Sequence, residues 1–171
     1  TKSLSLFPHH SSPYSKTHAN YKFFERYISK LSCKQMEGLH LENFKISKKQ
    51  LQGLFYQCKK FSWLKFGSCK LDTKDLVIPE KADYSLKILS LEYSGHTTCS
   101  NWIRNPDGLT NLLFAISRWG LKLSLTHIDV SWNSFSKSQL EDIFKEHEFV
   151  GTKVSGLNFL GEKRYTFKLD E

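Results

Sequence analysis

The chain has few cysteines and no long hydrophobic segment. Four cysteines stand at positions 33, 58, 69 and 99, without any Cys-x-x-Cys pair, which argues against a disulfide scaffold and against a structural zinc site. The longest clean apolar run covers residues 112–116, too short to cross a bilayer. Asn-x-Ser/Thr acceptors are also absent. These features predict an intracellular protein in a reducing compartment, with no transmembrane segment.

Acidic residues are scarce in the N-terminal part of the chain. Residues 1–35 contain six Lys/Arg and one Glu, so the remainder holds nineteen of the 25 basic and sixteen of the 17 acidic residues. The net charge of +8 therefore divides into +5 and +3, which makes the N-terminal arm the basic region. The first 24 residues contain serine and no acid. Organellar targeting segments share these two features, which keeps the mitochondrial matrix as an alternative compartment, but such segments are usually Arg-rich and the first arginine here is Arg26. Because the chain begins at Thr1, a processed or trimmed form is one interpretation.

Motifs of common enzyme classes are missing as well. The chain contains no Gly-x-Ser-x-Gly, Walker A or His-Glu-x-x-His sequence, so we predict no catalytic residue, no cofactor and no small-molecule substrate. His96-x-x-Cys99 offers two metal-ligand types, but no second pair completes a set of four, and we predict a plain loop there. With 171 residues, of which 39% are hydrophobic, the chain is long enough for one domain with a packed core.

A short apolar pattern recurs along the chain. Two apolar residues separated by one position begin at 39, 64, 89, 128 and 157, with spacings of 25, 25, 39 and 29. The five pairs are Leu39-x-Leu41, Leu64-x-Phe66, Leu89-x-Leu91, Ile128-x-Val130 and Leu157-x-Phe159. Such short strands cannot bury themselves alone, so we expect parallel copies stacked in register.

Three of these pairs are followed by a helical stripe with the spacing i, i+3, i+4, i+7. The stripes are Leu51, Leu54, Phe55, Cys58; Leu109, Leu112, Leu113, Ile116; and Leu140, Ile143, Phe144, His147. Ser47-x-x-Gln50 and Ser136-x-x-Gln139 read as capping boxes, and Asn105-Pro106 provides a cap and a first-turn proline. In the second unit Asp72 stands at the cap position and Pro79 follows closely, which predicts a single turn.

Residues 64–71 and 128–135, LKFGSCKL and IDVSWNSF, resemble the leucine-rich repeat pattern LxLxxN/CxL. Unit lengths of 25 and 29 with true helices resemble the ribonuclease-inhibitor and cysteine-containing subtypes. The resemblance implies an α/β fold, a short solenoid of about four to five strand–helix units with a parallel sheet on its concave face. It also implies that Cys69 and Asn133 tie down the loop backbone. The same column holds Phe44, Ser94 and Glu162 in the other units.

The two ends of the repeat region have different patterns. Phe24, Tyr27, Ile28 and Leu31 form another helical stripe, which predicts a capping helix over 20–34. Residues 164–169 alternate polar and apolar after Gly161 and favour a C-terminal hairpin, with a fifth repeat as the alternative. We therefore divide the chain into an extended basic N-terminal arm, 1–18, and a leucine-rich-repeat domain, 19–171, with repeats over about 36–160 and a C-terminal cap over 161–171.

The polar strand positions of this register define three columns on the concave face. They hold His40, Lys65, Ser90, Asp129, Asn158; then Glu42, Gly67, Glu92, Ser131, Leu160; then Asn43, Ser68, Tyr93, Trp132, Gly161. Tyr93 and Trp132 are the residue types most often found as binding anchors, and charged neighbours help to orient a partner. We predict a partner-binding patch of His40, Glu42, Lys65, Glu92, Tyr93, Asp129, Ser131 and Trp132. An ordinary solvated strand face is the alternative.

These features favour a non-enzymatic interaction or assembly subunit of a larger complex, a scaffold that binds protein partners through its concave face and its N-terminal arm. His40, Lys65 and Asp129 are types used in acid–base chemistry, but an open surface gives them no pocket. The arm and the residues directly after it interleave Lys16 and Lys22 with aromatic residues. A basic adaptor that binds RNA through this arm is therefore the alternative function.

Overall fold

A computed structural model describes the chain in segments, with a main sheet of seven strands. The described residues are 3–6, 19–20, 36–57, 61–78, 85–92, 106–118, 124–131, 133, 135–157 and 164–168. The strands in sheet order are β1 (Ser3–Leu6), β3 (Gly38–Glu42), β5 (Trp63–Gly67), β7 (Ile88–Ser90), β8 (His127–Asp129), β9 (Lys153–Leu157) and β10 (Arg164–Lys168). All neighbours pair in parallel except β9 and β10, which are antiparallel.

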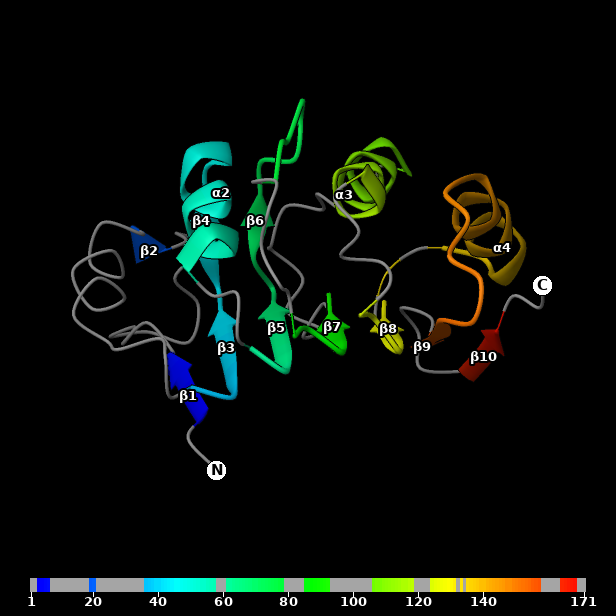
Figure 1. Ribbon diagram of the computed structural model, residues 1–171, viewed down its shortest axis with the longest axis horizontal. Helices are drawn as coiled ribbons and strands as arrows, with labels where there is room; N and C mark the ends of the chain where they lie inside the picture. Colours follow the sequence, from blue (N-terminus) through cyan, green and yellow to red (C-terminus); the bar gives the residue numbers. More distant parts are fainter. Residues whose placement is uncertain are drawn as a thin grey trace.

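The remaining elements lie on one side of this sheet (Figure 1). A second parallel sheet has the order β2 (Ala19–Asn20), β4 (Phe44–Ile46) and β6 (Lys70–Leu71). The described helices are α2 (Lys48–Gln57), α3 (Pro106–Arg118) and α4 (Lys137–Glu146). The main-sheet strands follow one another along the long axis in chain order, opposite the helices. The protein thus has a mixed α/β fold with a mostly parallel sheet.

The register of the sheet confirms four of the five predicted strand positions. Leu39 pairs with Leu64, Leu64 with Leu89, and Leu89 with Ile128. Because side chains alternate between the two faces of a strand, residues two positions further on return to the same face. All eight residues of the four pairs are accordingly buried, and their first members form one continuous row across the core.

The fifth predicted strand position is wrong. Ile128 pairs with Val154 rather than with Leu157, so the fifth strand lies three residues earlier than expected. Its second inward position is Gly156, which is buried but has no side chain to mark the pattern. The predicted C-terminal hairpin is present, since β10 runs antiparallel to β9. β9 is therefore both the last parallel strand and the first strand of the hairpin.

The sheet also begins earlier than the repeat pattern indicates. Ser3–Leu6, inside the segment predicted as an extended arm, forms β1 and pairs in parallel with β3. Leu4 and Leu6 lie opposite Leu39 and Leu41 and pack partly buried against the core. The predicted capping helix over 20–34 lies outside the described residues, apart from Asn20, which belongs to β2.

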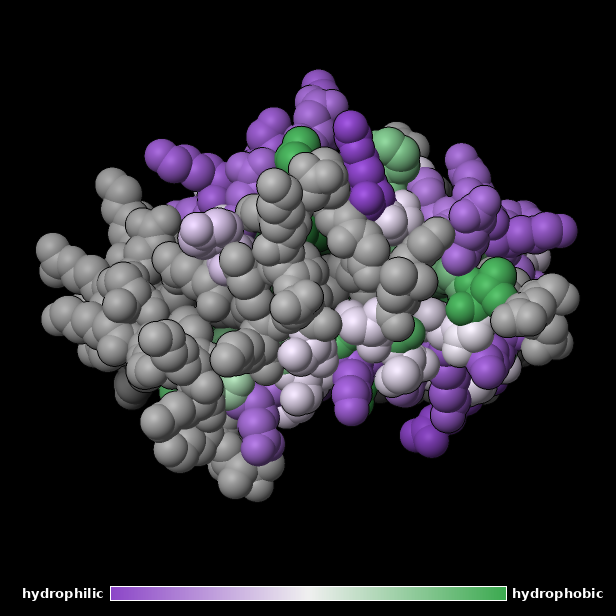
Figure 2. Space-filling model, viewed as in Figure 1, coloured by the Kyte–Doolittle hydropathy of each residue, from purple (hydrophilic) through white to green (hydrophobic). Residues whose placement is uncertain are grey.

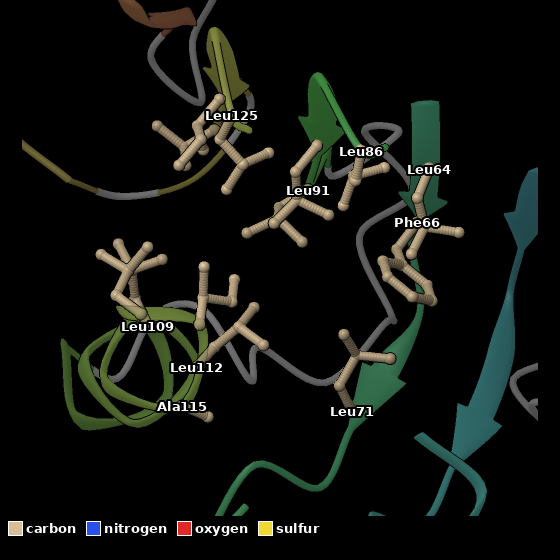
Figure 3. Close-up of a cluster of buried hydrophobic side chains, with 14 of the residues drawn as sticks. Leu64, Phe66, Leu71, Leu86, Leu91, Leu109, Leu112, Ala115 and Leu125 are labelled. Carbon is tan, nitrogen blue, oxygen red and sulfur yellow. The ribbon is translucent and has the colours of Figure 1, made fainter. Parts of the chain in front are cut away.

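Helix α3 shows how the helices complete the core. Figure 3 shows Leu109 and Leu112 on this helix pointing toward Leu91 and Leu125 on the sheet side. All four side chains are buried. The helix stripe and the inward strand residues thus cover each other, which neither can achieve alone.

The helix ends follow the predicted capping chemistry. The Ser136 backbone N–H donates to Oε1 of Gln139 at 2.9 Å, and the Gln139 backbone N–H donates to Oγ of Ser136 at 3.2 Å. Ser47 and Gln50 make the same reciprocal pair at 3.0 and 3.4 Å. After β6 the described chain makes only a short turn, closed by Leu76 N–H to the Thr73 carbonyl. This agrees, over the described residues 72–78, with the single turn predicted for the second unit.

Two buried side chains tie successive loops together. The Cys69 thiol donates to the carbonyl of Leu41 at 3.3 Å. Nδ2 of Asn133 lies 2.9 Å from the Leu91 carbonyl and 2.8 Å from the Val130 carbonyl. Both side chains therefore reach back to the second inward residue of the preceding unit, the role that the repeat resemblance implies for this column.

Candidate protein-interaction surface

We call the side of the main sheet that carries the alternate, non-core residues the open face. Because the strands are in register, its residues form rows that cross the sheet. One row holds Gly38, Trp63, Ile88, His127, Lys153 and Lys168, and the next holds His40, Lys65, Ser90, Asp129, Ser155 and Thr166. The second row confirms the first predicted column over its first four members. Ser155 takes the place predicted for Asn158, because the fifth strand is shifted by three residues.

The third predicted column leaves the extended strand at its first two positions. Asn43 and Ser68 follow the strands and have positive φ angles of 60° and 47°. They turn the chain out of the sheet in two successive units, and Ser68 is buried. Tyr93 and Trp132, the two predicted anchors, lie outside the described residues.

His40 and Glu42 form one local pair on the open face. Nε2 of His40 lies 3.0 Å from Oε2 of Glu42, and both side chains are largely buried. The Glu42 carboxylate extends over the neighbouring strand, where a Cβ at Gly67 would lie 1.9 Å from Oε2. Glycine at position 67 therefore makes room for this carboxylate to lie close to the sheet.

The other predicted charges are paired as well. Nζ of Lys65 forms an ion pair with Oε2 of Glu92 from the next unit. Asp129 accepts hydrogen bonds from the backbone N–H of Ser131 at 2.9 Å and from its hydroxyl at 2.6 Å. The six described members of the predicted patch thus form three local pairs: His40 with Glu42, Lys65 with Glu92, and Asp129 with Ser131.

Two residues that the sequence reasoning missed give this face an apolar centre. Trp63 and Ile88 are direct cross-strand neighbours, and Ile88 is 42% exposed. A Cβ at Gly38 would lie 1.9 Å from Cε2 of Trp63, so the indole lies across the adjoining strand. Extending the strand alternation two residues toward the N-terminus from His40 and Lys65 would have found this row.

The described chain contains no group of three or more His, Cys, Asp or Glu side chains that could hold a metal ion. His96 and Cys99 lie outside it. Within the same residues, no helix is both long and apolar enough to span a membrane. Comparisons with protein-family models, curated proteins and solved structures found no match to the chain. The geometry of the open face is therefore the basis for a functional proposal.

Proposed function

We propose that the chain is a leucine-rich-repeat solenoid of the ribonuclease-inhibitor or cysteine-containing kind. Three observations support this. The strands β3, β5, β7, β8 and β9 stack in chain order with Leu39, Leu64, Leu89, Ile128 and Val154 in one row. The helices α2, α3 and α4 follow three of these strands, and each carries buried apolar residues at i, i+3 and i+4. The motif residues Cys69 and Asn133 hydrogen-bond to carbonyls of the preceding unit.

On this fold the chain acts as a non-enzymatic subunit that binds a protein partner within a larger assembly. The observation that carries this function is the apolar pair Trp63–Ile88 on the open face, beside charges that are already paired within the chain. Large apolar side chains surrounded by a polar rim are the usual anatomy of a protein-binding surface. Because Lys65 and Glu92 neutralise each other, apolar contact rather than net charge provides most of the binding energy at this site.

The N-terminal arm has a smaller part in this proposal than its composition indicates. β1 holds Ser3–Leu6 in the sheet with Leu4 and Leu6 packed against the core, so these two apolar side chains are taken up by the fold rather than offered to a partner. We assign the protein to an intracellular, reducing compartment, where the buried Cys69 thiol stays reduced and keeps its hydrogen bond to Leu41. The mitochondrial matrix satisfies the same condition.

The test is affinity purification with the intact chain as bait, followed by mass spectrometry. The variant is Trp63→Ala/Ile88→Ser, and the control is Tyr56→Ala/Val77→Ser, which removes exposed apolar groups away from the open face. We expect a protein partner that resists about 0.5 M salt, is lost with the first variant and is retained with the control. Apolar contacts are insensitive to ionic screening, which explains the expected salt resistance.

Two results would contradict the proposal. Equal recovery of every partner with both variants would show that the open face does not bind them. Recovery that disappears with ribonuclease and falls steeply with salt would instead favour the basic RNA adaptor, because phosphate contacts release counterions. Thermal unfolding of both variants, measured in parallel, checks that each one folds.

A further inference from the structure

The last two strands differ from the rest of the open face in their charge. Lys153 on β9 lies directly opposite Lys168 on β10, and both are exposed. On the other side of Lys153, in the same row, stands His127. Arg164, also exposed, begins β10. Among the described residues no acidic side chain forms an ion pair with Lys153, Arg164 or Lys168.

Like charges that face each other across a strand pair weaken that pair. The hairpin nevertheless keeps two lysines opposite one another, and Figure 2 shows hydrophilic side chains projecting where β9 and β10 lie. Asp129 is the nearest acidic residue of the second row, and its carboxylate already accepts two hydrogen bonds from Ser131. The hairpin therefore presents a cationic strip that lacks a described counterion.

β10 is also the last strand in the sheet order. No described strand pairs with its outer edge. An edge strand offers a row of backbone N–H and C=O groups to another extended chain, and basic side chains on the edge discourage unselective pairing. Arg164 and Lys168 repel a second basic strand such as another copy of β10, but they attract an acidic one.

We propose that the outer edge of β10 binds an extended acidic segment of a protein partner, which adds a strand to the main sheet. This inference rests on the proposed function and names the kind of segment the partner provides. Arg164, Thr166 and Lys168 share the open face, since residues two apart on a strand face the same way. A paired segment therefore carries acidic residues four positions apart, opposite Arg164 and Lys168, with a polar residue between them.

The geometry favours a polypeptide over a nucleic acid. An added strand uses the backbone edge for affinity and alternate side chains for selectivity, and β10 provides both. The middle row here consists of Thr166, Ser155 and Asp129. A nucleic acid laid along this row would bring its phosphates to the Asp129 carboxylate, which repels them.

The experiment measures binding of labelled nine-residue peptides to the full chain by fluorescence anisotropy. One blocked peptide carries Glu at positions 3 and 7 among Thr and Val. Its control has the same composition with Glu at positions 3 and 6, which places the two carboxylates on opposite faces of a strand. We expect the first peptide to bind and the second to bind about tenfold more weakly, since only one ion pair and a mismatched face remain.

Charge reversal then tests the residues. Arg164→Glu/Lys168→Glu should weaken the 3,7-Glu peptide about tenfold or more, because two attractions become two repulsions. A peptide with Lys at positions 3 and 7 should recover binding to this variant. The control Lys49→Glu/Lys74→Glu makes the same change in net charge at exposed lysines away from the hairpin and should stay within about twofold of the unmodified chain.

The amide hydrogen-exchange rates of residues 164–168 provide a second measurement, because charge attraction without strand pairing does not change these rates. Bound peptide should protect amides of β10, because an added strand engages backbone N–H groups. Equal affinity for both Glu peptides, no recovery with the Lys peptide, or no protection would overturn the inference. Tighter binding of a nine-nucleotide oligouridylate at the same residues would overturn it in favour of nucleic acid. If the affinity purification still recovers a partner whose binding depends on Trp63 and Ile88, the proposed function stands even when this inference fails.

Discussion

The two faces of the main sheet are made from the same strands but carry different kinds of side chain. On β7, Leu89 is fully buried, whereas its chain neighbour Ile88 is 42% exposed. The core face carries one row of aliphatic residues of similar size across five strands. The open face carries tryptophan, isoleucine, paired charges and, on the hairpin, cations that have no ion-pair partner among the described residues. The core face therefore encodes the fold, and the open face is where neighbouring strands acquire distinct properties.

The largest expected effect comes from truncating the core face. Leu91→Ala should lower the free energy of unfolding by about 2–5 kcal/mol, because it removes buried methyl groups and leaves a cavity between β7 and α3. Ile88→Ala, on the same segment but on the open face, should cost less than about 1 kcal/mol. Urea denaturation of both variants makes the comparison. Equal losses would mean that the two faces are not distinguished in the way the register implies.

A smaller effect is expected where the chain leaves the sheet. Asn133→Ala removes an amide whose two hydrogens are shared among the carbonyls of Leu91, Val130 and Ser131. The expected loss of stability is about 1–3 kcal/mol, since these buried carbonyls lose a donor. Cys69→Ala removes a weaker thiol donor and should cost about 1 kcal/mol. Thermal unfolding of the two variants ranks them, and a larger loss for Cys69→Ala would contradict this account.

The smallest effect belongs to the charged pairs of the open face. Lys65→Gln breaks the ion pair with Glu92, and both side chains are partly exposed. The expected change in unfolding free energy is below about 1 kcal/mol and should shrink further in about 0.5 M salt. Lys74→Gln, at an exposed position outside the sheet, is the matched control. A loss above about 2 kcal/mol for Lys65→Gln alone would show that the open face also holds the fold together.

The sequence predicted the parts of the fold that depend on local periodicity. The helix stripes and both capping boxes are properties of neighbouring residues, so they could be read directly. The pairing of Leu39, Leu64, Leu89 and Ile128 was also readable, because each is followed by a second inward apolar residue. β9 was misplaced because Gly156 occupies that second position, and the leucine at 157 offered a more conspicuous pattern. β1 was missed because residues 1–18, with two prolines and five serines, were interpreted as an extended arm.

The candidate site was predicted less completely than the fold. His40, Glu42, Lys65, Glu92, Asp129 and Ser131 were placed on the correct face by alternation alone. Their division into local pairs depends on which side chains are long enough to contact a residue of another unit, as Lys65 contacts Glu92. The aligned sequence alone does not show these contacts. The indole of Trp63 lies across Gly38 because that position lacks a Cβ, a contact between units 25 residues apart. Such contacts become visible only when the register and the side-chain volumes are considered together.

The order of the strands has a mechanical consequence. β1 and β10 lie at opposite ends of the main sheet, and each strand between them bonds to its nearest neighbours in the chain-ordered row (Figure 1). Tension applied along the long axis therefore runs in the direction of the inter-strand hydrogen bonds, and each strand pair in the row carries the whole load. Shear geometry, in which all bonds of a strand pair resist together, does not arise. The protein should lengthen under small forces by releasing one strand at a time from either end, while the strands in the middle keep their register.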